Sequence, residues 1–516
     1  MLVRPQRNIN IDRLQREKGI TRFLDTVERI GNKLPDPFML FVYLAVFVIF
    51  LSWLVSSLGA TVVHPGTGEE MLIKSLISTE GLHYMLTSMV TNFTEFKPLG
   101  LVLGMMLGIG LAEKVGLLET VIRRVIYRAP KSLVTYILVL VGILGNIASD
   151  AAWVIIPPLG AIVFYSIGRH PLAGLAAGFA SAGAGFTANF IVAGTDALLS
   201  GITTEVAQSI DQTIVVTPVD NWYFMSVSVL VLTIVGGLIT DRLIEPSLGV
   251  YQGTITKQME DISPQEVKGL RNAGIVAFGY ILLLVTTLMF PGSPLRNEEG
   301  GIIPSPFLDG IIPIILLFFI TVGVTYGVTV KKIKSSKDIP KYMGEAMQSM
   351  SGYIVLIFAA AQFIAYFNWS NLGIWIAVNG AEFLSSIELT GVSIIIGYIL
   401  FTAFLGLLIT SGSSKWALEA PIFVPMFMLL NYHPAFIQAA YRIADSSVNI
   451  ITPLNPYIVL ILAFMREYDK KAGLGTLISL MLPYSLIFLI VWLILLIVFT
   501  VFGIPFGPGV GMYMNS

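Results

Sequence analysis

Apolar runs long enough to cross a lipid bilayer recur along this chain of 516 residues, and they constrain its fold more than any other feature. A helix needs roughly 20 apolar residues to cross the hydrocarbon core. Hydrophobic residues make up 55% of the chain and charged residues only 12%, which leaves too little polar surface for a protein dissolved in water. The sequence lacks the short alternating segments of a membrane β-barrel. We therefore predict an all-α polytopic membrane protein.

The positions of the apolar runs and of the basic residues together predict a topology. Nine runs predict crossing helices, near residues 37–59, 98–113, 171–195, 221–241, 272–291, 309–330, 346–367, 434–464 and 475–504. Lys and Arg concentrate in cytoplasmic loops. The tail 1–34 carries eight of them, whereas 196–241 and 368–414 carry none. We therefore expect the N-terminus in the cytoplasm and these two connectors on the outer side.

Two further apolar stretches, 132–168 and 389–432, are interrupted by polar, small and proline residues. The loop charges agree with nine crossings only if each of these stretches returns to the face from which it enters. The first starts next to Lys131 and ends at Arg169, so it enters from the cytoplasm; the second starts on the uncharged outer side. Each is therefore predicted to be a re-entrant hairpin, and the two hairpins enter from opposite faces.

The motif W-x4-P-x11-H-P occurs once around each predicted hairpin. Both copies have the same spacing, with an offset of 263 residues (416 − 153), and the matching residues are Trp153, Pro158, His170 and Pro171, then Trp416, Pro421, His433 and Pro434. Chance is the alternative, since Trp and Pro are common in membrane helices. With opposite hairpin directions, the match predicts an inverted repeat, in which substrate and ion sites lie where broken helices meet near the midplane. The two histidines are either structural junction residues or titrating groups, and the first interpretation is favoured.

These features divide the chain into four parts. They are a cytoplasmic tail 1–34, a first repeat 35–248 with its hairpin 132–168, a linker and connecting span 249–308, and a second repeat 309–516 with its hairpin 389–432. The zero count of cysteine excludes disulfides and thiolate metal sites.

Charged residues within apolar runs are costly and mark functional sites by default. Arg442 and Asp445 are three residues apart on one predicted helix, so we expect them to pair, as part of a site or as a structural ion pair. Asp196 is a further candidate, although it could lie hydrated at the outer end of its span. Pro453 removes a backbone donor and predicts a broken helix, which suits a sodium site near Asp445 and Asn449.

The tips of the two hairpins offer backbone amides, hydroxyls and small polar side chains, which suit a carboxylate or a sodium ion. Trp416 adds an aromatic face, and Lys415 is either a cation of the site or a residue that reaches to the membrane surface. The candidate ion or tip ligands are Asn146, Ser149, Asp150, Asn189, Ser411, Asn449 and Asn455.

Several long stretches resemble the AbgT family, the p-aminobenzoyl-glutamate transporters. They include G-R-H-P-L-A-G-L-A-A, G-T-D-A-L-L-S-G-I-T, K-W-A-L-E-A-P-I-F-V-P-M and Q-A-A-Y-R-I-A-D-S-S-V-N-I-I-T-P. The resemblance covers essentially the whole chain. It implies a homodimer of subunits with nine spans and two hairpins, which moves p-aminobenzoyl-glutamate or exports sulfonamide antimetabolites.

The resemblance also implies a set of transport residues in this sequence. They are Asp196, Ser413, Trp416, Pro434, Arg442, Asp445 and Pro453. One departure is Trp153, where relatives are expected to have Tyr; we expect it to affect the packing of the first hairpin tip and the substrate preference, with no direction assigned.

Other classes of function fit the sequence less well. An intramembrane enzyme lacks a zinc motif, and a Ser–Lys dyad from Ser413 or Ser414 with Lys415 would need adjacent helical residues to face each other. A channel is not expected to have inverted repeats and broken helices. The main alternative is a sodium-coupled dicarboxylate transporter of similar architecture. We expect a multi-pass protein of the bacterial inner membrane, driven by protons or sodium, with no cofactor except a bound sodium ion and no nucleic-acid partner.

Overall fold

The computed structural model describes residues 35–65, 67–148, 151–253, 262–290, 292–388 and 391–514. Over these ranges the chain is mostly helical, and the predicted all-α class is confirmed. A short hairpin is the exception: β1 (Thr61–Val63) pairs antiparallel with β2 (Glu70–Leu72). The tail 1–34, predicted to be cytoplasmic, lies outside the described residues.

The first half of the chain forms a series of helices separated by short connections. They are α2 (Pro37–Ser57), α3 (Thr79–Thr94), α4 (Lys97–Lys114), α5 (Leu117–Tyr127), α6 (Val134–Leu144), the 3-10 helix η1 (Gly145–Ala148), α7 (Ala151–Ser166), α8 (Pro171–Ala184), α9 (Gly194–Ala207), α10 (Trp222–Ile239), the π-helix η2 (Thr240–Ile244) and α11 (Glu245–Leu248).

The second half continues in the same way. Its helices are α12 (Pro264–Met289), α13 (Pro306–Asp309), α14 (Ile311–Thr329), α15 (Asp338–Ser349), α16 (Ser351–Trp369), α17 (Leu372–Ser386), α18 (Val392–Gly406), α19 (Gly412–Leu429), α20 (Pro434–Val448), α21 (Ile458–Tyr468) and α22 (Leu474–Val501).

In the described part of the chain, seven helical stretches are long and apolar enough to cross a membrane. They are α2, α3 with α4, α10 with α11, α12, α14, α16 and α22, and they coincide with seven of the predicted spans. The other two predicted spans are not continuous helices: 171–195 holds α8 and a non-helical segment before α9, and 434–464 holds α20 and most of α21. In the second of these spans, the interruption contains Pro453 and Pro456, which cannot donate backbone hydrogen bonds.

In the described residues each of the two interrupted stretches holds two separate helices. Stretch 132–168 holds α6 and α7, and α6 has only 11 residues. At 1.5 Å per residue α6 covers roughly half of the ~30 Å hydrocarbon core. Stretch 389–432 holds α18 and α19 in the same order. The re-entrant paths of both stretches stay predictions.

The copies of the repeated motif form the same local structure. The helices α8 and α20 both begin at the proline of the motif, and the preceding histidine caps each helix. The Leu172 amide donates to His170 Nδ1 and the Ala435 amide to His433 Nδ1, both at 3.2 Å. Burial lowers the pKa of both histidines, that of His433 to about 4. Neutral caps support the prediction of structural junction residues; the inversion of the two repeats stays a prediction.

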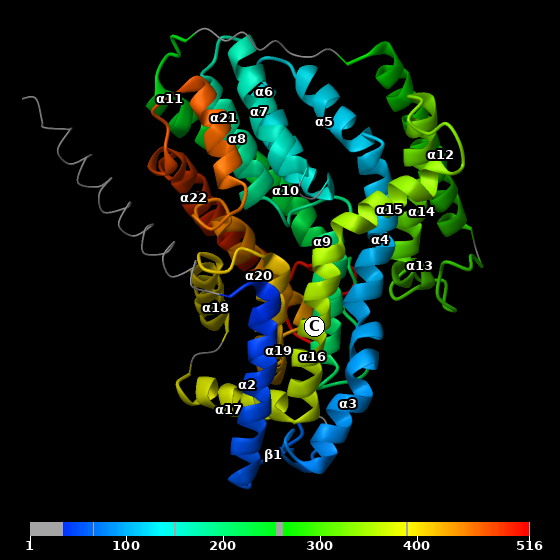
Figure 1. Cartoon of the computed structure of the whole chain (residues 1–516), viewed down its shortest axis with the longest axis vertical. Helices are drawn as coiled ribbons and strands as arrows, with labels where there is room; N and C mark the ends of the chain where they lie inside the picture. Colours follow the sequence, from blue (N-terminus) through cyan, green and yellow to red (C-terminus); the bar gives the residue numbers. More distant parts are fainter. Residues whose placement is uncertain are drawn as a thin grey trace, which may run out of the picture.

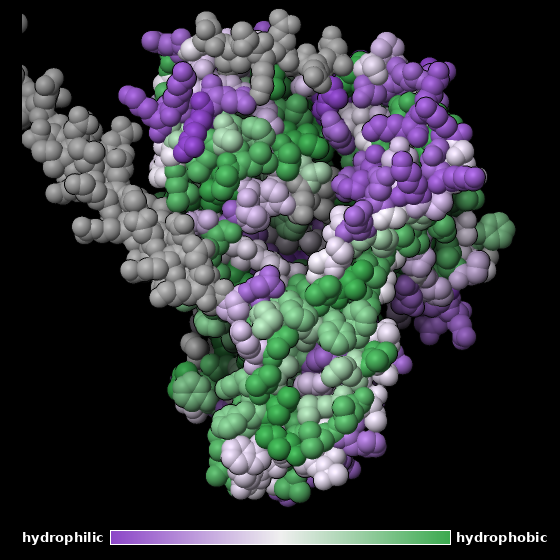
Figure 2. All heavy atoms as spheres, viewed as in Figure 1, coloured by the Kyte–Doolittle hydropathy of each residue, from purple (hydrophilic) through white to green (hydrophobic). Residues whose placement is uncertain are grey.

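Figure 1 shows how the helices are arranged around the centre of the molecule. The helices α2, α3 and α17 lie toward one end, and α5, α11 and α12 lie toward the other (Figure 1). In Figure 2 hydrophilic residues gather at the end that carries α5, α11 and α12, whereas apolar residues cover much of the other half. The helix α12 exposes 69% of Phe278 and 65% of Leu283, as expected of a helix that faces lipid.

Candidate functional site

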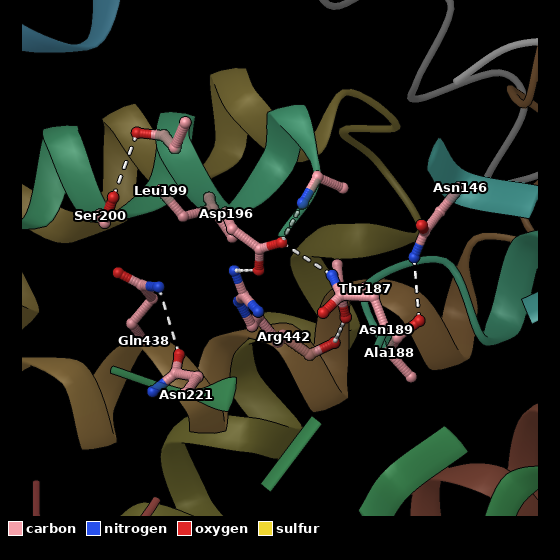
Figure 3. A network of polar contacts seen from close by, with 12 residues as sticks. Asn146, Thr187, Ala188, Asn189, Asp196, Leu199, Ser200, Asn221, Gln438 and Arg442 are labelled. Atoms are coloured by element: carbon pink, nitrogen blue, oxygen red, sulfur yellow. Dashed lines mark hydrogen bonds and ion pairs between the residues drawn. The ribbon is translucent and has the colours of Figure 1, made fainter. Parts of the chain in front are cut away.

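The first broken span contains a non-helical segment between α8 and α9, residues 185–193. Backbone groups in such a segment need partners when they are buried. Asn146, in η1 after α6, supplies them: its Nδ2 donates to Phe186 O at 2.7 Å, and it donates to Ala188 O at 2.9 Å (Figure 3). The predicted tip residue thus stabilises the break. Ser149 and Asp150, the other two candidates at this tip, lie outside the described residues.

Asp196 lies in the first turn of α9, immediately after this break, and is only 2% exposed. One oxygen accepts hydrogen bonds from Asn189 Nδ2 and from the Ala193 amide, both at 2.7 Å. The other oxygen lies 2.5 Å from Arg442 Nη2 on α20 (Figure 3). The alternative that Asp196 is hydrated at the outer end of its span is therefore wrong.

The predicted pairing of Arg442 with Asp445 is also wrong. Arg442 pairs with Asp196, and Asp445 Oδ1 lies 2.8 Å from Lys415 Nζ on α19. Residues three apart on a helix can pair, but α9 and α19 each bring an opposite charge to one of them. Lys415 is 0% exposed, so it does not reach to the membrane surface. The result is two buried ion pairs that connect α20 to α9 and to α19.

A cavity of about 430 Å³ lies between the two broken spans. This volume is within the range of small-molecule sites. Five of the predicted site residues line the cavity: Ser411, Ser413, Asp445, Asn449 and Asn455. The face in Figure 2 is visibly hollowed near its centre.

Aromatic rings form much of the wall of this cavity. Trp153 stacks on Tyr457, with ring centroids 5.2 Å apart and an interplanar angle of 15°. Phe186 and Tyr441 add further rings. Trp153 was expected to affect the packing of the first hairpin tip and substrate preference; its stacking on Tyr457 in the cavity wall could not be predicted from the sequence.

The other described site residues lie outside the wall of the cavity: Asn146, Asn189, Asp196 and Arg442, described above, and Trp416, Pro434 and Pro453. Trp416 is 0% exposed, its Nε1 donates to Leu199 O and Thr203 Oγ1, and its ring packs on Tyr441. Pro434 starts α20, and Pro453 lies in the break between α20 and α21. In this structure they shape the elements around the cavity, and their roles in transport stay predictions.

The sodium site predicted near Asp445 and Asn449 has a partial match in the structure. Asn449 Oδ1 is buried and has no hydrogen-bond partner among the described residues, as a cation ligand would. Asp445, however, already faces the ammonium group of Lys415. The described residues contain no cluster of three or more His, Asp or Glu that could hold a metal ion. A sodium ion here would depend on neutral oxygens and on displacement of Lys415.

Sequence reasoning missed several buried polar residues next to the site. Thr187 in the first break lies 2.8 Å from Ser446, hydroxyl to hydroxyl, and thereby links the two broken spans. Glu419, one helical turn after Lys415, is 2% exposed. Lys415 and Glu419 are four residues apart in an apolar stretch, and this spacing could have predicted Glu419 as a buried site residue.

The described geometry agrees with the comparisons with known proteins. The family model described as "AbgT putative transporter family" matches residues 22–514. The chain belongs to the AbgT putative transporter family. It is 45% identical over 485 residues to the p-aminobenzoyl-glutamate transport protein of Escherichia coli (strain K12), covering 94% of this chain and 96% of that protein.

Two solved structures show the same fold. The Alcanivorax borkumensis YdaH transporter, described as having an unusual topology, matches with a TM-score of 0.88 and 38% identity, over 92% of this chain and 100% of that chain. Neisseria gonorrhoeae MtrF, described within a class of antimetabolite efflux pumps, matches with a TM-score of 0.89 and 43% identity, over 95% and 100%. The resemblance seen in the sequence is thus confirmed, and the chain is a multi-span membrane protein of a transporter family.

Proposed function

We propose that the chain is a secondary active transporter for p-aminobenzoyl-glutamate in the bacterial cytoplasmic membrane, with its N-terminus in the cytoplasm. The observation that carries this proposal is the meeting of two broken spans, α8–α9 and α20–α21, beside a cavity of about 430 Å³. Discontinuous helices of this kind surround the substrate sites of secondary transporters. The proposal gives the protein no enzymatic activity.

The groups around the cavity suit the chemistry of the substrate. p-Aminobenzoyl-glutamate has two carboxylates and one aromatic ring. The rings of Trp153 and Tyr457 offer a surface for stacking, and Ser411 and Ser413 lie at the N-terminus of α19, where the helix dipole favours negative charge. Lys415 and Arg442 add buried positive charge close to the wall.

Export of sulfonamide antimetabolites is a second activity that we propose for the same cavity. The similarity to MtrF favours it, because that protein is described within a class of antimetabolite efflux pumps. Sulfonamides and p-aminobenzoyl-glutamate both contain an aminobenzene ring, so the aromatic wall would bind both. Competition between the two compounds for one saturable flux would support a shared site.

We also propose that a proton or sodium gradient drives transport and that the protein is a homodimer. Asp445 and Asn449 are the proposed sodium ligands if sodium is the coupling ion, since Asn449 Oδ1 is buried without a hydrogen-bond partner in the described structure. Light scattering of the protein in detergent would give the mass of the assembly, and a monomer would contradict the dimer.

The transport proposal is tested with purified protein in proteoliposomes. Wild-type protein is expected to give saturable flux of p-aminobenzoyl-glutamate. Asp445→Ala removes a cavity carboxylate and leaves Lys415 unpaired, so the flux should fall to the background of protein-free vesicles while the variant still inserts and folds. Asp309→Ala, at an exposed carboxylate on α13, is the matched control and should keep wild-type flux. Wild-type flux in Asp445→Ala would exclude Asp445 from the site.

A further inference from the structure

Glu419 is a buried carboxyl group that the ion pairs of the site leave unused. It lies on α19 and is 2% exposed. Its Oε2 accepts hydrogen bonds from Thr402 Oγ1 at 2.6 Å and from Tyr398 Oη at 3.0 Å, both on α18. Its Oε1 is buried and has no hydrogen-bond partner among the described residues. An unpaired oxygen in a buried carboxyl group is a position where a proton is expected.

Both buried cations of the site are paired with other carboxylates, so neither balances the charge of Glu419. Lys415 pairs with Asp445, and Arg442 pairs with Asp196. No ion pair of the described residues includes Glu419. A lone carboxylate in a low-dielectric interior is strongly disfavoured, so burial favours the neutral, protonated acid while Lys415 stays with Asp445.

Lys415 is placed to reach either carboxyl group. It precedes Glu419 by four residues on α19, so the two side chains lie on one face of the helix. On α18 the facing residues Tyr398, Thr402 and Gly406 are also spaced by four. A Cβ atom at Gly406 would lie 2.8 Å from Lys415 Nζ, so the glycine leaves room for the ammonium group beside the two hydroxyls that bind Glu419.

The two carboxyl groups differ in their access to water. Asp445 lines the cavity, whereas Glu419 lies behind it, against α18. Asp445 can therefore be hydrated after it loses Lys415, but Glu419 cannot be ionised without a nearby cation. This asymmetry makes the position of Lys415 and the protonation of Glu419 depend on each other.

We propose that Glu419 carries the coupling proton of this transporter and that Lys415 links its protonation to the occupancy of the cavity. When Lys415 pairs with Asp445, as in this structure, Glu419 holds a proton. When Lys415 turns to Glu419, the O–H bond of the acid breaks, the proton passes to water, and the ammonium group balances the new carboxylate. The inference rests on the proposed transport function and identifies the residue that makes it proton-dependent.

The other groups near Glu419 do not replace Lys415 as its counter-charge. Tyr398 on α18 and Tyr441 on α20 carry no positive charge and donate hydrogen bonds to Glu419 and to Gly412 O, and Asp445 on α20 is an acid. On α9, Asp196 is paired with Arg442, and Glu205 is itself an acid. Glu382 on α17 is exposed, and the helix α16 contains no charged residue.

The first experiment compares two modes of transport in proteoliposomes. Glu419→Gln mimics the protonated acid and keeps the acceptor for Tyr398 and Thr402. Counterflow of p-aminobenzoyl-glutamate needs no net proton movement and should persist in this variant, whereas accumulation driven by a pH gradient should fall by about tenfold or more. Glu419→Asp should restore part of the driven accumulation. Glu382→Gln, at an exposed carboxyl group, is the matched control and should behave as wild type.

Three results would overturn the proposal. One is driven accumulation in Glu419→Gln at the wild-type level. The other is loss of counterflow together with driven accumulation, because that outcome indicates a structural role for Glu419. The third is wild-type accumulation that follows a sodium gradient and is unaffected by a pH gradient. This result would exclude Glu419 as a carrier of the coupling proton but leave the transport function standing.

A second experiment does not depend on transport. The infrared spectrum of the purified protein at neutral pH should contain the carbonyl band of a protonated carboxylic acid, and Glu419→Gln should lack that band. If wild type fails to move the substrate yet shows the Glu419 band, the proposed function is wrong while the protonation of Glu419 holds. An unchanged band in Glu419→Gln would refute the protonation of Glu419 directly.

Discussion

The ion pair between Asp196 and Arg442 should hold the two broken spans together, and a double-mutant cycle measures how strongly. The charged atoms lie 2.5 Å apart, and the residues are 2% and 1% exposed. At an effective dielectric constant of about 20 the attraction at this distance is roughly 6 to 7 kcal/mol before desolvation is subtracted. Removal of one partner should cost about 3 to 5 kcal/mol, because the other charge stays buried.

The cycle consists of Asp196→Asn, Arg442→Gln and the double variant, with the free energy of unfolding measured in mixed micelles. We expect a coupling energy of about 2 to 4 kcal/mol between the two sites. The amide oxygen introduced by Asp196→Asn can still accept from Asn189 and from the Ala193 amide. Most of the loss of stability in this variant should therefore come from the unpaired charge of Arg442.

An exposed ion pair in the same protein provides the control. Lys74 and Glu80 lie 3.7 Å apart, and their side chains are 45% and 71% exposed. The cycle of Lys74→Gln and Glu80→Gln should give a coupling energy of about 0 to 1 kcal/mol. Equal coupling energies in the two cycles would refute the claim that the buried pair connects the broken spans.

Two further predictions concern the helix cap and the cavity wall. The pKa of His433 in the folded protein is about 4, below the value of ~6.5 in the unfolded chain, so the folded state binds fewer protons. Stability should therefore be constant above pH ~6.5 and should fall by up to about 3 kcal/mol as the pH drops toward 4. His433→Asn keeps a side-chain acceptor for the cap but cannot titrate, so its unfolding free energy should depend less on pH in this window; an unchanged profile would contradict the assignment. Trp153→Ala removes the ring that stacks on Tyr457 and should weaken binding of p-aminobenzoyl-glutamate by about tenfold in calorimetry. Trp153→Phe should bind nearly as wild type, and equal affinities of Trp153→Ala and wild type would remove this ring from the site.

The spans and the breaks of this fold could be predicted because their signals are local. Run length and composition located seven continuous spans, and Pro453 with Pro456 marked the second break. The helix α3 escaped prediction because its many polar residues give the stretch Thr79–Lys114 a low mean hydropathy for a span.

The charge partners could not be predicted in the same way. Sequence spacing placed Arg442 beside Asp445, but the rotation of α20 against its neighbours decides which partner each residue meets. The partner of Arg442 is Asp196, 246 residues away in the sequence, and that of Asp445 is Lys415 on α19. Contacts of this kind depend on the packing of whole helices, which single-sequence patterns do not encode.

We propose that this protein moves p-aminobenzoyl-glutamate through the cavity between the two broken spans, driven by an ion gradient. The most direct test of this claim is accumulation of the compound in proteoliposomes that hold the wild-type protein under an imposed proton or sodium gradient. The structure leads us to expect saturable accumulation above the external concentration, which collapses when the gradient is dissipated. Flux that runs only downhill and does not saturate would contradict the claim and indicate a channel.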